Sequence, residues 1–136
     1  MKTQLVPDFS SAKDNRQTIL LVDDEITVLK LLEFVLKKEY KLVIHNNGLE
    51  AMNWLDSGYL PDLIVSDLEM PYVDGIDFVK SLKSSGYYRE IPIILLSAAY
   101  SVEDLAQKLP YNFDALVSKP FNPGKLKDNI QSLLNR

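Results

Sequence analysis

Four short apolar runs of this sequence each end on a polar side chain that can take part in chemistry. The runs LLVDD, LIVSD, IILLS and ALVSK end at Asp23 and Asp24, at Asp67, at Ser97 and at Lys119. Each run has the length and the content of branched apolar residues that are typical of a buried strand. The carboxyl ends of parallel strands meet at one edge of a sheet, where ligands bind, so we expect these side chains to converge there.

Three carboxylates at one sheet edge would repel one another. Asp23 and Asp24 are adjacent, and Asp67 ends another predicted strand. Close like charges raise pKa values or attract a cation, and a site built from oxygen ligands suits a hard ion such as Mg²⁺. The sequence therefore predicts a divalent metal site.

The other two side chains of the set favour an anion. Lys119 supplies a positive charge and Ser97 supplies a hydroxyl donor, a combination that fits phosphoryl oxygens. A carboxylate can itself be the nucleophile of phosphoryl transfer while a metal ion and a lysine neutralise charge on the phosphoryl oxygens. Among the three acids, Asp67 is the best candidate nucleophile.

From Thr18 onward, predicted strands alternate with predicted helices, and these elements would position the residues just described. Short apolar runs alternate with segments of helical apolar spacing, which predicts repeated βα units and a parallel sheet. We expect strands at about 18–23, 41–45, 62–66, 91–96 and 114–118. We expect helices at about 25–38, 48–57 and 75–85, a short one opened by Ser101 and Asp104, and a last one with Asn122 as N-cap and Pro123 at its first position.

Two helices also carry specific expectations. Asp24 is a candidate N-cap of the first helix. The second helix is expected to present Leu49, Met52 and Leu55 to the core.

Composition limits the class of protein. The chain has 136 residues, of which 46% are hydrophobic and 25% charged, as in one soluble globular domain. Its net charge of −4 and its lack of a basic cluster disfavour direct binding to nucleic acid. It has no cysteine, no apolar run long enough to span a membrane and no apolar stretch of a secretory signal, so we expect a cytoplasmic protein without a membrane partner. We expect residues 1–17 to form a flexible tail.

The acidic pair, the later Asp, the Ser and the Lys-Pro pair together resemble the receiver domains of bacterial two-component response regulators. The resemblance covers about residues 18–136, and the segments DLEMPYVDGIDF and SKPF also look like parts of that family. We expect a stand-alone, chemotaxis-regulator-like member of the family, without an output domain after the last helix. We therefore expect a doubly wound, flavodoxin-like α/β fold, with a five-stranded parallel sheet of order 2-1-3-4-5 and helices on both faces.

The resemblance implies a complete set of metal ligands. Asp24, Asp67 and the backbone carbonyl of Glu69 would bind Mg²⁺ directly, and Asp23 would act through water.

The resemblance also implies the course of phosphorylation. Asp67 would accept a phosphoryl group from a sensor histidine kinase or a phosphotransfer protein. Ser97 and Lys119 would then hold the phosphoryl oxygens. A cis peptide bond is implied between Lys119 and Pro120.

Two positions depart from the family's pattern. Leu116 stands where the family has Tyr or Phe, a ring that couples the phosphate to the surface formed by the fourth helix, fifth strand and fifth helix of the expected fold. Tyr100 is the candidate substitute for that ring. Glu69 adds a carboxylate two residues after the phosphoacceptor. This charge could either lengthen or shorten the lifetime of the phosphate on Asp67.

The combined prediction is a phosphorylation-activated signalling switch that catalyses only its own phosphorylation and dephosphorylation, and is not a turnover enzyme. Its output would be binding to an unknown downstream protein or formation of a homodimer through the surface just described. A terminal regulator and a relay shuttle are both open, and so is a constitutive interaction module, for which Leu116 is the main argument. A metal-dependent phosphohydrolase with Asp67 as nucleophile is a further alternative, which the short chain and Glu69 in place of a second Asp disfavour.

Overall fold

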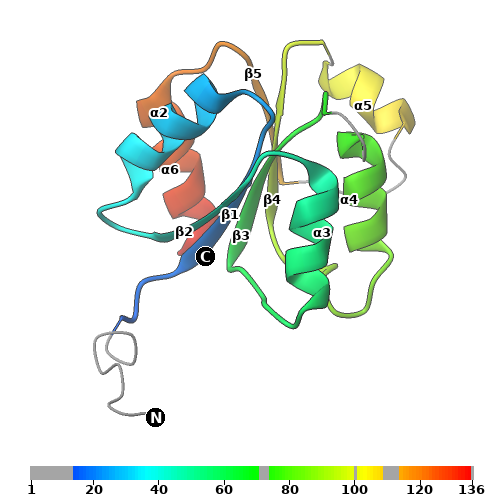
Figure 1. The fold of residues 1–136 in the computed structure, drawn as a ribbon. Coiled ribbons are helices and arrows are strands. Elements are labelled where there is room, and N and C mark those ends of the chain that lie inside the picture. Colours follow the sequence, from blue (N-terminus) through cyan, green and yellow to red (C-terminus); the bar gives the residue numbers. More distant parts are fainter. Residues whose placement is uncertain (1–13, 71–73, 100, 109–113, 136) are drawn as a thin grey trace.

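The computed structural model has a central five-stranded parallel sheet with helices on both faces (Figure 1). It describes residues 14–70, 74–99, 101–108 and 114–135. The strands are β1 (Thr18–Val22), β2 (Lys41–His45), β3 (Leu63–Asp67), β4 (Ile93–Ser97) and β5 (Ala115–Ser118). The helices are α2 (Ile26–Leu36), α3 (Gly48–Asp56), α4 (Gly75–Lys83), α5 (Val102–Lys108) and α6 (Pro123–Leu134).

The strand order is β2-β1-β3-β4-β5, and each neighbouring pair is parallel. The predicted order 2-1-3-4-5 and the doubly wound fold class are therefore confirmed. β1 lies between β2 and β3, so the chain changes its direction of winding at this point. Val22 at the end of β1 is paired with Ser66 near the end of β3, which brings the residues that follow these strands side by side. A switch point of this kind is where open α/β sheets bind ligands.

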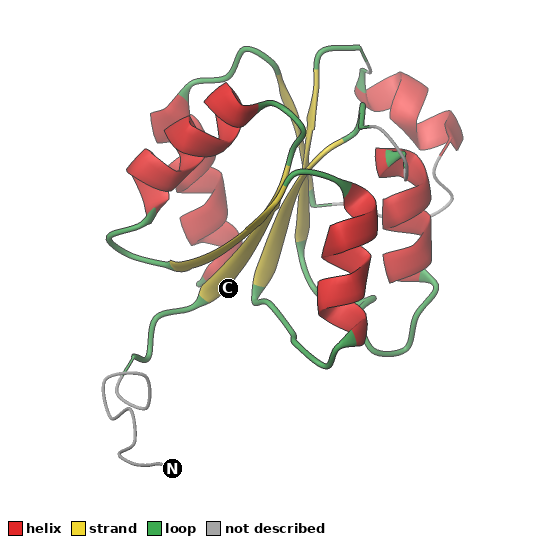
Figure 2. Cartoon of the chain, in the orientation of Figure 1, coloured by secondary structure: helices red, strands yellow, loops and turns green. Residues whose placement is uncertain are grey.

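The sheet is covered on both faces, as the two layers of helices in Figure 2 show. Alternate residues of β1 point to opposite faces, so its apolar side chains enter two separate cores. One core joins Leu20 and Ile64 to α3, α4 and α5 through Leu55, Phe78 and Leu105. The other core joins Leu21 and Val65 to α2 and α6 through Leu32, Leu36, Leu126 and Ile130.

The predicted caps of the last two helices are confirmed. Ser101 and Asp104 form a capping box, in which each side chain accepts a hydrogen bond from the other residue's backbone nitrogen, at 3.1 and 3.3 Å. The side chain of Asn122 accepts a hydrogen bond from the backbone nitrogen of Lys125 at 3.1 Å, with Pro123 at the first position of α6.

Two expectations for the first two helices are wrong. The N-cap of α2 is Glu25 rather than Asp24, and no side chain caps this helix, because Glu25 turns its carboxylate toward Lys119. In α3 the expectation is wrong for Leu49, which is 49% exposed, but right for Leu55, which is buried with Ala51, and for Met52, which packs against the core. Ala51 lies four residues before Leu55, so these two positions define the face toward the sheet.

The peptide bond after Lys119, the start of β1 and the lengths of the helices complete the description of the fold. The peptide bond between Lys119 and Pro120 is cis, as predicted. Of the predicted tail, the described residues 14–17 lead into β1, where the Gln17 carbonyl accepts a hydrogen bond from Lys41 N at 2.9 Å. Each helix among the described residues is too short or too polar to cross a membrane.

Candidate functional site

Lys119 contacts three carboxylates at the carboxyl edge of the sheet. Its Nζ lies 2.9 Å from Asp23 Oδ2, 2.9 Å from Glu25 Oε1 and 3.3 Å from Asp67 Oδ1. Asp23 follows β1, Glu25 precedes α2, Asp67 ends β3 and Lys119 follows β5. The predicted convergence of Asp23, Asp67 and Lys119 is therefore present.

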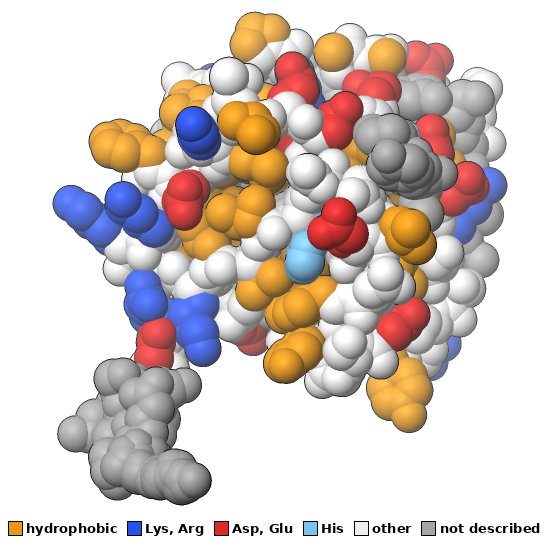
Figure 3. All heavy atoms as spheres, in the orientation of Figure 1, with side chains coloured by type: hydrophobic (Ala, Val, Ile, Leu, Met, Phe, Trp, Pro, Cys, Tyr) orange, Lys and Arg blue, Asp and Glu red, His pale blue; other side chains and the backbone are white. Residues whose placement is uncertain are grey.

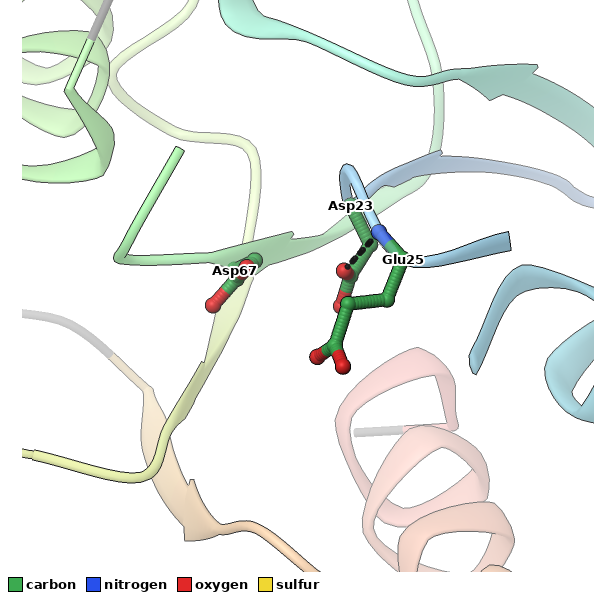
Figure 4. Close-up of side chains that lie close together, drawn as sticks. All are labelled: Asp23, Glu25 and Asp67. Carbon is green, nitrogen blue, oxygen red and sulfur yellow. Dashed lines mark hydrogen bonds between the residues drawn. The ribbon is translucent and has the colours of Figure 1, made fainter. Parts of the chain in front are cut away.

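The turn after β1 sets the positions of the first two acids. The backbone nitrogen of Glu25 donates a hydrogen bond to Asp23 Oδ1 at 2.9 Å, and Figure 4 shows this bond with Asp67 close by. Asp23 is 1% exposed. Asp24, between them in the sequence, has an exposed side chain and is not part of this cluster. Its role as a direct metal ligand stays a prediction, and Glu25 is a site residue that the sequence did not indicate.

Burial and the neighbouring charges shift the pKa values of the cluster. Burial raises the pKa of Asp23, although the Glu25 backbone nitrogen and Lys119 counteract it. Burial, together with the charge of Asp23, raises the pKa of Asp67 to about 7 despite the opposing effect of Lys119. Burial alone would lower the pKa of Lys119, but its hydrogen bonds to Glu25 and Asp23 raise that pKa overall. The single positive charge of Lys119 thus balances only part of the negative charge of the three carboxylates that it contacts.

These residues fit a hard divalent cation. One carboxylate oxygen from each of Asp23, Glu25 and Asp67 lies within 4.8 Å of the others. Hard ions prefer oxygen ligands, and a cation would offset the excess negative charge. The cluster is an acidic pocket with the chemistry that the sequence predicted for a metal site.

Ser97 ends β4, the strand next to β3, and its hydroxyl contacts Glu69. Ser97 Oγ donates a hydrogen bond to Glu69 Oε2 at 2.9 Å and accepts one from the backbone nitrogen of Ala99 at 3.0 Å. The other carboxylate oxygen of Glu69 accepts a hydrogen bond from the backbone nitrogen of Ala98 at 3.3 Å. The backbone nitrogen of Glu69 donates to Asp67 Oδ1 at 3.2 Å. Glu69 therefore links Asp67 to the end of β4, a role of its side chain that the sequence did not predict.

The backbone after Asp67 is packed closely by the start of α4. A Cβ atom on Gly75 would lie 2.4 Å from Leu68 Cα and 2.5 Å from the carbonyl oxygen of Asp67. The position therefore requires glycine, because no side chain fits between the two backbones.

Of the predicted switch residues Leu116 and Tyr100, the structure describes only Leu116. Leu116 pairs with Leu95 across β4 and β5 and is partly buried against the core that includes α3, α4 and α5. Tyr100 lies outside the described residues.

Comparisons with known proteins agree with this geometry. The family model of the response regulator receiver domain matches residues 19–131. Response regulator Rre1 of Synechocystis sp. is 34% identical over 121 residues, which cover 88% of this chain and 52% of that protein. The phosphate regulon transcriptional regulatory protein PhoB of Escherichia coli is also 34% identical, over 119 residues that cover 87% of this chain and 52% of PhoB. The chain thus spans about half the length of the curated relatives it matches.

Solved structures show the same fold. A signal receiver domain of a histidine kinase from Syntrophus aciditrophicus has a TM-score of 0.79 and 33% identity, covering 88% of this chain and 90% of that one. The chemotaxis response regulator CheY4 of Vibrio cholerae has a TM-score of 0.79 and 29% identity, covering 88% of this chain and all (100%) of that one. With the family match and the shared sheet order, these similarities establish that the chain belongs to the response regulator receiver domain family.

Proposed function

We propose that this receiver domain is a phosphorylation-activated switch in which Asp67 accepts a phosphoryl group with the help of Mg²⁺. The observation that carries the proposal is the position of Asp67, whose Oδ1 lies 3.3 Å from Lys119 Nζ at the switch point of the sheet. Receiver domains of two-component systems are signalling switches rather than turnover enzymes.

The transfer step uses the carboxylate of Asp67 as nucleophile. One of its oxygens attacks phosphorus, the bond from phosphorus to the donor nitrogen or oxygen breaks, and the donor leaves with that bonding pair. Lys119 Nζ and the Ser97 hydroxyl then bind phosphoryl oxygens, which balances charge that Asp67 alone cannot hold in a buried position. The protein mainly positions and neutralises the reacting groups.

A donor set made only of oxygen atoms favours Mg²⁺ as the metal. Asp24, Asp67 and the backbone carbonyl of Glu69 would bind Mg²⁺ directly and Asp23 through water, as the resemblance implies. When bound, Mg²⁺ neutralises charge on the phosphoryl oxygens. The excess of carboxylates around Lys119 supports a cation at this place.

The phosphodonor would be a sensor histidine kinase or a phosphotransfer protein. An apolar surface beside the site supports a protein as donor: Ile26, Leu31 and Phe34 of α2 are 60%, 39% and 75% exposed. Figure 3 shows hydrophobic side chains gathered over α2. A hollow lined by Leu31, Lys119 and Phe121 continues this surface toward the site.

The output would be a change in the surface formed by α5, β5 and α6, read by a downstream protein or a second copy of the chain. Movement of Ser97 toward the phosphoryl group would pull the loop after β4. At position 116 the family usually has an aromatic side chain, which moves together with the residue at position 97. Leu116 has neither a ring nor a hydroxyl, so we expect the coupling between the phosphoryl group and the output surface to depend on packing alone. Both a terminal regulator and a relay shuttle fit this scheme.

Intact mass spectrometry after incubation with Mg²⁺ and acetyl phosphate tests the proposal. We expect a phosphoryl adduct on the wild type, dependence of this adduct on Mg²⁺, no adduct on Asp67→Asn and much less on Lys119→Ala. An adduct that persists in Asp67→Asn would assign the phosphoacceptor to another residue. A folded wild type that forms no adduct with acetyl phosphate or with a histidine kinase would favour a phosphate-independent interaction module.

A further inference from the structure

The carboxylate of Glu69 lies across two hydrogen-bond donors at the end of β4. Oε2 accepts from the Ser97 hydroxyl at 2.9 Å, and Oε1 accepts from the Ala98 backbone nitrogen at 3.3 Å. A charged acceptor strengthens both bonds. Ser97 is 1% exposed, whereas Glu69 and Ala98 are exposed, so the hydroxyl donor is buried and the carboxylate reaches it from the surface. The unphosphorylated site thus already holds an anion that belongs to the chain itself.

These donors lie next to the proposed phosphoacceptor. Asp67 is paired in the sheet with Leu96, the residue before Ser97, and the backbone nitrogen of Glu69 donates to Asp67 Oδ1 at 3.2 Å. A phosphoryl group on Asp67 brings three strong acceptor oxygens and added negative charge to this place. The phosphoryl oxygens and the Glu69 carboxylate would compete for the same hydroxyl and would repel each other.

We propose that Glu69 is a positioning residue that acts as an internal competitor of the phosphoryl group. Its carboxylate holds the Ser97 and Ala98 donors until phosphorylation of Asp67 displaces it. This inference rests on the proposed function of Asp67. The Ser97 and Ala98 donors can bind phosphoryl oxygens fully only in molecules in which Glu69 has released them. The smaller the fraction of such molecules, the weaker is the apparent affinity of the site for a phosphoryl-like ligand. By linkage, the phosphoryl group weakens the hold on Glu69 by the same factor and frees this side chain.

Beryllofluoride is a suitable probe, because it forms a phosphoryl-like group on a carboxylate in the presence of Mg²⁺. Its affinity is measured by isothermal titration calorimetry at a Mg²⁺ concentration that saturates each variant. We expect Glu69→Ala to bind about tenfold more tightly than the wild type, since no charged acceptor has to be displaced. Glu69→Gln keeps the shape but has a neutral acceptor, so its affinity should be intermediate.

A matched control separates this competition from a general charge effect. Glu103→Gln removes an exposed carboxylate from the first turn of α5 and should bind as the wild type does. In amide NMR spectra without ligand, the Ala98 resonance should move in Glu69→Ala and stay in place in Glu103→Gln. A merely structural role of Glu69 would not tighten beryllofluoride binding.

The outcomes distinguish the inference from the proposed function. If the wild type binds beryllofluoride and Glu69→Ala binds equally or more weakly, the inference is overturned and the role of Asp67 stands. If Glu103→Gln gains as much affinity as Glu69→Ala, general charge explains the effect and the inference is likewise overturned. Absence of binding in all variants, together with absence of a phosphoryl adduct, would overturn the proposed function and the inference with it.

Discussion

The backbone nitrogen of Gly75 donates a hydrogen bond to the carbonyl oxygen of Leu68 at 3.0 Å. This bond joins the first residue of α4 to the first residue after Asp67, and the absence of a side chain on Gly75 permits the short distance. The helix therefore fixes the backbone on which the proposed phosphoacceptor lies.

Replacing Gly75 with alanine should disturb both stability and phosphorylation. The added Cβ would meet the backbone of Leu68 and Asp67 at 2.4 to 2.7 Å, so α4 or the strand end has to move. We expect Gly75→Ala to lower the free energy of unfolding by about 2 kcal/mol, measured by urea denaturation, and to slow adduct formation. Gly86→Ala is the control, since nothing lies within 4 Å of its added Cβ. Equal stability of the two variants would contradict the close packing described for Gly75.

Removing the charge of Lys119 should destabilise the fold when Mg²⁺ is absent. Lys119→Met leaves Asp23, Glu25 and Asp67 without the cation that contacts all three, and breaking a buried pair in this way costs about 3–5 kcal/mol. Thermal unfolding in a chelating buffer measures the loss. Addition of Mg²⁺ should restore part of it, because the ion supplies positive charge to the same carboxylates.

Lys127 offers a matched control for this experiment. It forms an ion pair with Glu39, but its side chain is 33% exposed and that of Glu39 is 46% exposed. We expect Lys127→Met to lower stability by less than about 1 kcal/mol, with no dependence on Mg²⁺. Similar losses in the two variants would show that the contacts of Lys119 are no stronger than those of a surface pair.

The stability contributed by Asp67 should depend on pH. Burial and the charge of Asp23 raise its pKa from 3.8 to about 7, so the folded state favours the protonated form. The associated stabilisation is complete below pH 3.8 and is lost as the pH rises through about 7. At pH 8 without Mg²⁺, Asp67→Asn should therefore be more stable than the wild type by about 1–3 kcal/mol, and the difference should shrink toward pH 5.

Urea denaturation at both pH values checks this prediction. The control is Asp128→Asn, which removes an exposed carboxylate from α6 and should change stability by less than about 0.5 kcal/mol. A wild type that is more stable than Asp67→Asn at pH 8 would mean that Lys119 outweighs burial at Asp67.

Mg²⁺ binding should distinguish Asp24 from Glu25. We expect Asp24→Asn to weaken Mg²⁺ binding by at least about tenfold, because the proposal makes it a direct ligand. Glu25→Gln should have a smaller effect, since its carboxylate is neutralised by Lys119 at 2.9 Å. Calorimetric titration with Mg²⁺ measures both. The opposite ranking would place the ion in the cluster of Asp23, Glu25 and Asp67.

The sequence predicted the strands, their order and the convergence of Asp23, Asp67 and Lys119. These predictions succeeded because each polar residue directly follows or ends an apolar run, so the strand itself fixes its location. The boundaries differ by at most two residues; β4, for example, begins at Ile93 rather than 91. Such features depend on local pattern and on the geometry of parallel sheets.

The contacts of Glu25 and Glu69 could not be predicted in the same way. Each is a long side chain at the surface, and its direction depends on a partner far along the chain. Lys119 is 94 residues from Glu25, and Ser97 is 28 residues from Glu69. A local pattern contains no information on which rotamer such a residue adopts, so only the folded arrangement reveals these two pairs.

The site collects residues from the ends of four strands, and the last of them, Lys119, follows β5. While the chain is being synthesised, Asp67 emerges from the ribosome long before Lys119, which the proposed phosphorylation of Asp67 requires. Domains acquire their long-range contacts only when the later segments are available. We therefore expect that an incomplete or unfolded chain would not be phosphorylated by a kinase. Only molecules in which β5 has joined the sheet would carry the phosphoryl group.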